Sequence, residues 1–127
     1  MTKIAQIVRM KAKPGRRQDL IDALAPAFIK AEGEGGTEVY VQFVDAQTVV
    51  KRPTGQGKAE LFITPAPDEI WYFELYTDDA ALKAHDDGYA TSPIASRIGE
   101  AIRDIIAEPH VCMRLTPIRA KGVAIAG

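Results

Sequence analysis

The side chains in this sequence best suited to acid–base chemistry are one histidine and one glutamate. His85 is our candidate general base, because an imidazole titrates closer to neutral pH than other side chains. Glu74 stands in an otherwise apolar segment, where a carboxylate must be paired, hydrogen-bonded or protonated, and it is our second catalytic candidate. The alternatives are a core histidine bonded to a backbone carbonyl, and a buried ion pair that fixes the sheet or a dimer.

Candidate ligand-binding residues are those that can hold the ring and the hydroxyl of a small aromatic compound. Tyrosine rings pack against an aromatic ring while their hydroxyls form hydrogen bonds. The predicted substrate-binding residues are Tyr40, Tyr72, Tyr76, Tyr89, Arg9 and Arg114. The two arginines are also the expected partners of Glu74. Ordinary core packing is the alternative for the tyrosines.

Other reactive residue types give weaker signals. Alternation along an extended strand turns Trp71 away from Glu74, so we assign it to a dimer core. We interpret His110 as a surface residue and Cys112 as a small buried one. A single cysteine forms no internal disulfide and no metal site built on paired cysteines. The sequence holds no glycine-rich nucleotide-binding motif, so we expect no metal and no cofactor.

Length and charge exclude several classes of protein. A chain of 127 residues fits a single domain over 1–127. The 16 basic residues nearly balance the 17 acidic ones, whereas a nucleic-acid-binding protein usually has a basic excess. We find no signal peptide and no apolar run near the ~20 residues that span a membrane, so we expect a cytoplasmic protein.

Hydrophobic periodicity predicts the elements that position these residues. Period-two patterns indicate strands and three-to-four-residue spacing indicates helices. The expected order is strand 4–12, helix 16–31, strand 37–44, strand 70–77, short helix 79–87, helix 93–107 and strand 110–118. The segment 45–69 is interpreted as an inserted β-hairpin arm, and 119–127 as a C-terminal tail.

This βαββαβ order predicts an α+β, ferredoxin-like fold with an antiparallel four-stranded sheet. Strands 37–44 and 70–77 are apolar on both faces, while helices can cover only one of them. We therefore predict a homodimer in which the second face is buried against another copy. The arm and the tail are expected to reach toward that partner or toward the mouth of a pocket.

Three short segments resemble the antibiotic biosynthesis monooxygenase family. Glu34-Gly35-Gly36-Thr37-Glu38-Val39-Tyr40 is similar to the family's Glu-Pro-Gly-Cys-x-x-Tyr segment, with Gly35 in place of the proline. Tyr72–Tyr76 followed by Ala81-Leu82-x-x-His85 is similar to its Glu-x-Trp strand and Ala-Leu-x-x-His helix, and Ser92-Pro93 opens the long helix as in the family. Counted forward from Glu74, His85 takes the position of the family's histidine. Counted back from Ser92, Tyr89 takes that position instead. One extra helical turn explains both counts, because residues four apart lie on the same face of a helix.

The resemblance implies a dimeric α/β barrel with a pocket between the sheet and the helices of each subunit. Known members include cofactor-independent monooxygenases, quinol oxygenases, haem degraders and enzymes of small signalling molecules. The haem branch uses an asparagine in the first strand, a tryptophan in the third and a histidine in the long helix. This chain has no asparagine, and Tyr76 and Gly99 occupy the other two positions, so haem degradation is disfavoured.

The resulting hypothesis is a cofactor-independent monooxygenase, an oxidoreductase that acts on a small phenol-, anthrone- or quinol-like substrate with dioxygen. Such chemistry needs a base, hydrogen bonds and a dry cavity. The alternatives are a non-catalytic dimeric module that binds such a ligand, and an isomerase-type proton-transfer enzyme of the same fold. A dry pocket in which His85 or Tyr89 points at Glu74 favours the enzyme.

Overall fold

The computed structural model describes residues 2–122, so most of the predicted tail lies outside the described residues. In chain order the elements are β1 (Ile4–Lys11), α1 (Arg17–Glu32), β2 (Thr37–Phe43), β3 (Ala46–Gly55), β4 (Lys58–Ala66), β5 (Glu69–Tyr76), α2 (Asp79–Thr91), α3 (Pro93–Ile102) and β6 (Val111–Leu115). Among these residues, no helix is long and apolar enough to cross a membrane.

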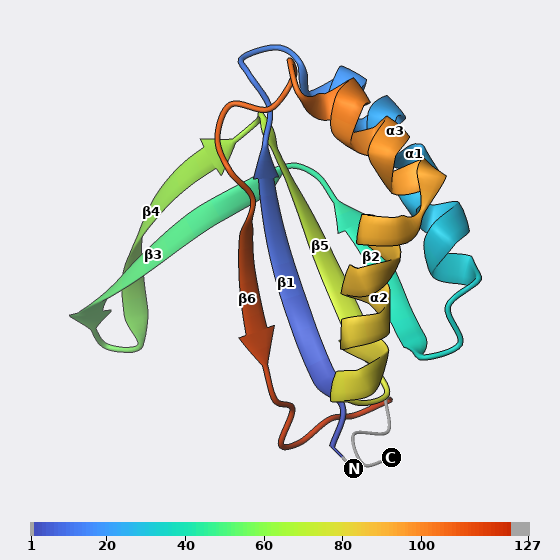
Figure 1. Ribbon diagram of the computed structural model, residues 1–127. Coiled ribbons are helices and arrows are strands. Elements are labelled where there is room, and N and C mark those ends of the chain that lie inside the picture. The colour runs from blue at the N-terminus through green and yellow to red at the C-terminus, as the bar shows by residue number, and fades with distance from the viewer. Residues whose placement is uncertain (1, 123–127) are drawn as a thin grey trace.

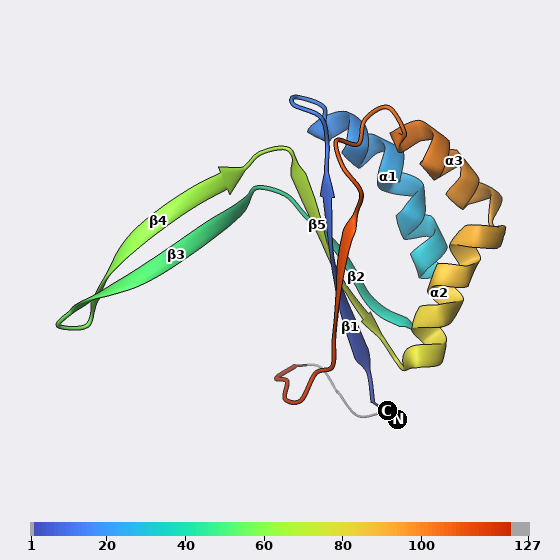
Figure 2. The same cartoon turned by 60° about the vertical axis from the view of Figure 1, so that its left-hand side comes forward.

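The main sheet has the topology expected from the element order. Strands β2, β5, β1 and β6 lie side by side in that order, and every neighbouring pair is antiparallel. Helices α1, α2 and α3 all cover one face of this sheet (Figures 1 and 2). The predicted ferredoxin-like α+β fold is confirmed.

A continuous apolar core joins the helices to the sheet. Its buried members include Val8, Met10, Leu20, Leu24, Ala27, Ile70, Ile98 and Ile105. Leu20, Leu24 and Ala27 lie three and four residues apart, which places them on one face of α1. Each fully buried side chain of this kind contributes about 1.5–3 kcal/mol to the hydrophobic driving force.

The other face of the sheet is apolar and exposed. Its large exposed side chains are Val41, Phe43, Val111, Met113 and Leu115. Phe43 is 51% exposed and Met113 is 57% exposed, values more typical of charged surface residues than of phenylalanine or methionine. Figure 2 shows this face on the side of the sheet opposite the helices. We call it the open face.

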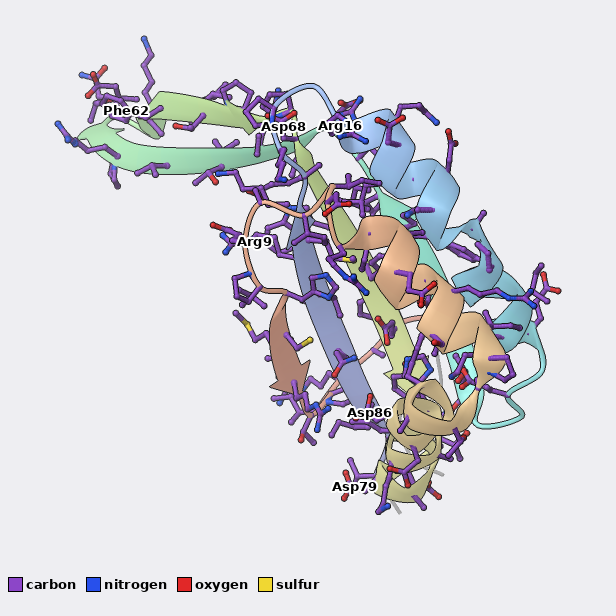
Figure 3. All side chains as sticks on the ribbon, turned by 45° about the horizontal axis from the view of Figure 1, so that its top comes forward. Arg9, Arg16, Phe62, Asp68, Asp79 and Asp86 are labelled. Carbon is purple, nitrogen blue, oxygen red and sulfur yellow. The ribbon has the colours of Figure 1, made fainter. Side chains whose placement is uncertain are left out.

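The insertion between β2 and β5 is a β-hairpin arm, made of β3 and β4 in a sheet of their own. Its turn is formed by Gly55, Gln56 and Gly57, all with positive φ (98°, 53° and 72°). The arm extends away from the rest of the domain, and Phe62 lies toward its far end (Figures 1 and 3). Its apolar residues Val49, Val50, Leu61, Phe62 and Ile63 are exposed.

The two helices before β6 differ from the predicted lengths. Helix α2 continues to Thr91, one turn beyond its predicted end, which is the extra turn inferred from the two motif counts. Helix α3 ends at Ile102 rather than near Ala107. The reason is that the carbonyl of Ile105 accepts a 2.8 Å hydrogen bond from the N–H of Lys13, which draws this segment onto the end of β1.

The strand lengths also need correction. β6 covers 111–115 rather than 110–118, and the arm strands are longer than the apolar runs that predicted them. Cys112 was predicted to be buried, but it is exposed, because β6 is an edge strand of the sheet.

Candidate functional site

A cavity of about 320 Å³ lies between the sheet and the helices. It is lined by Gln6, Val8, Met10, Leu24, Ala27, Tyr40, Tyr72, Glu74, His85, Asp86, Tyr89, Ala95, Ile98, Gly99, Ile102, His110 and Cys112. Asp86, Gly99, His110 and Cys112 are exposed and mark its rim. The volume is at the lower end of the range of about 300–1,000 Å³ for ligand pockets, so it suits a small ligand.

His85 is held between two carboxyl groups at the wall of this cavity. Asp78 caps α2 by accepting a 2.8 Å hydrogen bond from the N–H of Ala81, which fixes the start of the helix that carries His85. Nδ1 of His85 lies 2.8 Å from Oε1 of Glu34, and Nε2 lies 3.7 Å from Oε1 of Glu74. A carboxylate accepts only, so in the neutral form of the ring Nδ1 carries the proton and Nε2 is the basic nitrogen.

Glu34 is a site residue that sequence reasoning missed. It follows α1, and it accepts hydrogen bonds from Nζ of Lys30 at 2.6 Å and from Oγ1 of Thr37 at 3.1 Å. Burial acts to raise the pKa of its carboxyl, but the hydrogen bonds from His85 and Lys30 outweigh burial and hold the pKa below its usual value. Glu34 is therefore a carboxylate near neutral pH. The only sequence signal for Glu34 is its position at the start of the segment Glu34–Tyr40, which resembles the antibiotic biosynthesis monooxygenase family.

Glu74 has the opposite electrostatic environment. Burial raises the pKa of its carboxyl, even though the hydroxyl of Tyr76, the imidazole of His85 and Nε2 of Gln6 act to lower it. Tyr76 donates a short hydrogen bond to Oε1 of Glu74, and Gln6 donates another at 3.1 Å. The imidazole of His85 thus lies between the Glu34 carboxylate, at Nδ1, and the Glu74 carboxyl of raised pKa, at Nε2.

The two arginines predicted to pair with Glu74 have other partners. Arg9 lies on the open face, where it pairs with Glu108 at 3.1 Å, and Figure 3 shows it on the side of β1 away from the helices. Arg114 donates from Nε to Gln6 and from Nη2 to Asp86, at 2.9 and 2.8 Å. It reaches Glu74 only through Gln6. Neither arginine lines the cavity.

The tyrosines divide into a lining group and one supporting residue. Tyr40, Tyr72 and Tyr89 line the cavity, and the rings of Tyr40 and Tyr72 meet edge to face at 5.3 Å. Burial raises the pKa of all three hydroxyls, so they remain protonated donors. Tyr76 is fully buried behind Glu74 rather than exposed to the cavity.

The structure places both candidates for the family's histidine position at the cavity. The rings of His85 and Tyr89, one turn apart on α2, meet at 5.1 Å between centroids.

Trp71 lies on the open face of the sheet, opposite the cavity, as predicted from alternation. His110 is an additional lining residue, and burial lowers the pKa of its imidazole. Within residues 2–122, no three His, Cys, Asp or Glu side chains are grouped so as to hold a metal ion.

Comparison with known proteins identifies the fold. No family model and no curated protein matches the chain. A protein of unknown function from Nitrosomonas europaea, NE2512, is similar over 98% of this chain and 97% of its own, with 27% identity and a TM-score of 0.64. Rv0793 from Mycobacterium tuberculosis matches over 94% and 98%, with 19% identity and a TM-score of 0.67.

A third solved structure carries a functional name. It is called a "putative antibiotic biosynthesis monooxygenase" from Nitrosomonas europaea and matches over 95% of both chains, with 13% identity and a TM-score of 0.66. Structures with the same name from Chloroflexus aurantiacus and Caulobacter crescentus are also similar, at 22% and 18% identity. This chain therefore has the fold of proteins named as antibiotic biosynthesis monooxygenases.

Proposed function

We propose that this protein belongs to the antibiotic biosynthesis monooxygenases and is a cofactor-independent monooxygenase of a small phenol-, anthrone- or quinol-like compound. The observation that carries the proposal is the imidazole of His85, anchored through Nδ1 by Glu34, with Nε2 beside Glu74 at the wall of an aromatic cavity. Such a reaction needs a base with a fixed tautomer, hydrogen-bonding groups and a cavity that excludes water.

The reaction balances without an external reductant. Nε2 of His85 removes a proton from the activated carbon or hydroxyl of the substrate, and the resulting anion transfers one electron to dioxygen. The two radicals combine to form a C–O bond, and the protonated imidazole of His85 returns its proton to the resulting peroxide anion, which gives a hydroperoxide. In an anthrone-type substrate, loss of the second C–H proton and cleavage of the O–O bond then release water and leave a carbonyl, so CH₂ + O₂ gives C=O + H₂O.

The binding-module alternative expected His85 to be satisfied by backbone groups. Its two ring nitrogens instead face the side-chain carboxyls of Glu34 and Glu74. This arrangement supports a catalytic base. An isomerase-type enzyme would use the same base without dioxygen, and oxygen uptake separates the two.

The experiment is oxygen consumption by purified protein free of flavin, haem and metal, with anthrone or a hydroquinone as substrate. We expect uptake above the rate of autoxidation, and we expect His85→Ala to reduce it by about 100-fold or more. Lys83→Ala is the matched control, since Lys83 is an exposed residue of the same helix. Absence of uptake with every phenolic compound would overturn the monooxygenase proposal.

We further propose that the protein is a homodimer joined through the open face. The support is the run of exposed apolar residues on this face, which includes Phe43, Met113 and Leu115. An apolar face of this kind is typical of a surface buried by association. In such a dimer the two sheets face each other and the cavities lie on the outer sides, under the helices.

A further inference from the structure

The lining of the cavity offers a ligand no free cation. Among residues 2–122 it holds the carboxyl groups of Glu74 and Asp86 and no lysine or arginine. Of its two imidazoles, His85 is paired with Glu34, and burial lowers the pKa of His110. Asp86 is already paired with Arg114. Glu74 is buried, and its carboxyl has a raised pKa because of that burial. A ligand entering here meets no unpaired cation.

Two cations that contact residues of the lining, Lys30 and Arg114, are both engaged by other groups of the protein. Nζ of Lys30 contacts Glu34 at 2.6 Å and the carbonyl oxygen of His85 at 3.0 Å, and it lies 4.1 Å from the ring centroid of Tyr89. The guanidinium of Arg114 is shared between Gln6 and Asp86. A carboxylate brought into the cavity would lose its hydration without gaining an ion pair, which is strongly unfavourable.

A tyrosine hydroxyl in the lining retains a proton to donate. The hydroxyl oxygen of Tyr72 accepts a 3.0 Å hydrogen bond from Nε2 of Gln42, so its own proton is not used in that bond. Burial raises the pKa of the Tyr40 and Tyr89 hydroxyls, which also line the cavity, so both are protonated near neutral pH.

We infer that the cavity binds an uncharged aromatic compound with a carbonyl-type acceptor oxygen and discriminates against carboxylate-bearing compounds of the same shape. This inference rests on the proposed function only in placing the ligand in the same cavity. The hydroxyl of Tyr72 donates to the acceptor oxygen, and the acidic hydroxyl or carbon of the ligand faces His85 and Glu74. Charge, rather than size, sets the selectivity.

A matched series of fluorescent compounds tests this inference. 7-Hydroxycoumarin has a phenol and a lactone carbonyl and is uncharged at mildly acidic pH. 7-Hydroxycoumarin-3-carboxylate adds a negative charge to the same rings, and an aminomethyl derivative adds a positive one. Affinities are measured by fluorescence titration of the full chain, with Cys112→Lys as a variant that places a cation at the rim. Ser96→Lys, an exposed change on α3 outside the lining, is the control.

We expect the uncharged compound to bind at least about tenfold more tightly than the carboxylate. Cys112→Lys should improve carboxylate binding by about tenfold relative to the wild type, and Ser96→Lys should leave it unchanged. Three results would overturn the inference: equal or tighter carboxylate binding, tightest binding of the cationic compound, or no binding of the uncharged one. Selective binding of the uncharged compound without oxygen uptake on any phenolic compound would contradict the proposed function and leave this inference intact.

Discussion

Nδ1 of His85 lies 2.8 Å from Oε1 of Glu34, across 51 positions of sequence. The contact joins the segment that follows α1 to the inner face of α2, and it orients the imidazole so that Nε2 faces Glu74. The residues after Glu34 permit this approach. An added Cβ at Gly36 would lie only 2.4 Å from Cβ of Ala81. The segment at Gly36 and helix α2 therefore approach more closely than a residue with a side chain would allow.

Removal of the charge of Glu34 should slow turnover more than it weakens substrate binding. In Glu34→Gln the side chain keeps its size, but it no longer stabilises the protonated imidazole that forms when His85 takes a proton. We expect kcat to fall by at least about tenfold with KM nearly unchanged. Glu32→Gln makes the same charge change at an exposed position and should behave as wild type. A rise in KM alone would contradict a positioning role.

Adding a side chain at Gly36, where the chain packs closely on Ala81, should lower the free energy of unfolding. Gly36→Ala forces the 33–36 segment and α2 apart, and overpacking of this kind costs about 1–3 kcal/mol. At Gly35 an added Cβ meets no atom within 4 Å, so Gly35→Ala should change the free energy of unfolding by less than about 0.5 kcal/mol. Urea denaturation of the two variants measures the difference. Equal values would show that Ala81 moves aside without cost.

The raised pKa of Glu74 predicts a specific pH dependence of stability. Because burial raises the pKa in the folded state above its unfolded value, the protonated group favours folding, and this stability is lost as the pH rises through the folded-state pKa. Glu74→Gln removes the ionisable group. We expect its melting temperature to match wild type near about pH 4 and to exceed it increasingly toward about pH 7.

The control for this experiment is Glu34→Gln, for which we expect the opposite pH dependence of stability. The folded-state pKa of Glu34 is lowered, so its contribution is present above the unfolded pKa and is lost as the pH falls. That variant should therefore be less stable than wild type at neutral pH and approach it in acid. Parallel melting curves across the pH range, with no divergence for either variant, would contradict both assignments.

Charge on the open face should separate the proposed dimer. In Met113→Asp a carboxylate replaces a side chain that is 57% exposed in the monomer. Burying that charge in an apolar interface without a partner is strongly unfavourable, so we expect a monomer by sedimentation velocity at micromolar concentration. Ile29→Asp changes a residue that is 67% exposed on α1 and should remain dimeric. A wild-type protein that sediments as a stable monomer would refute the proposal.

The fold could be predicted from the sequence because the type of each main element is recognisable from its period, caps or flanking turns, and their order has a known architecture. Strand 37–43 alternates, α1 repeats every three to four residues, and Asp78 and Ser92 mark helix starts by capping. The end of α3 could not be predicted in this way. It is set by the carbonyl of Ile105 bonding to Lys13, a contact between segments distant in the sequence.

A site residue could be predicted only where the periodicity of its own strand or helix determines which way its side chain points. His85 and Tyr89 follow from helix spacing, and Glu74 from alternation in β5. β1 is apolar on both faces, so its pattern does not tell which face is covered by helices, and Arg9 was assigned to the wrong side. Gln6, the partner that Glu74 actually has from this strand, gave no signal, because cross-strand pairing is not encoded within one strand.

The arm shares no hydrogen-bond ladder with the main sheet, since β3 and β4 pair only with each other. Opening it therefore breaks none of the bonds that hold β1, β2, β5 and β6 together, and its amides report a separate unfolding event. An isolated hairpin is marginally stable in water, so in a monomer these amides should exchange with solvent far faster than those of β1. If the arm packs on a second copy, these amides exchange only as fast as the dimer dissociates. The hydrogen-exchange rates of residues 46–66 then report the rate of dimer dissociation.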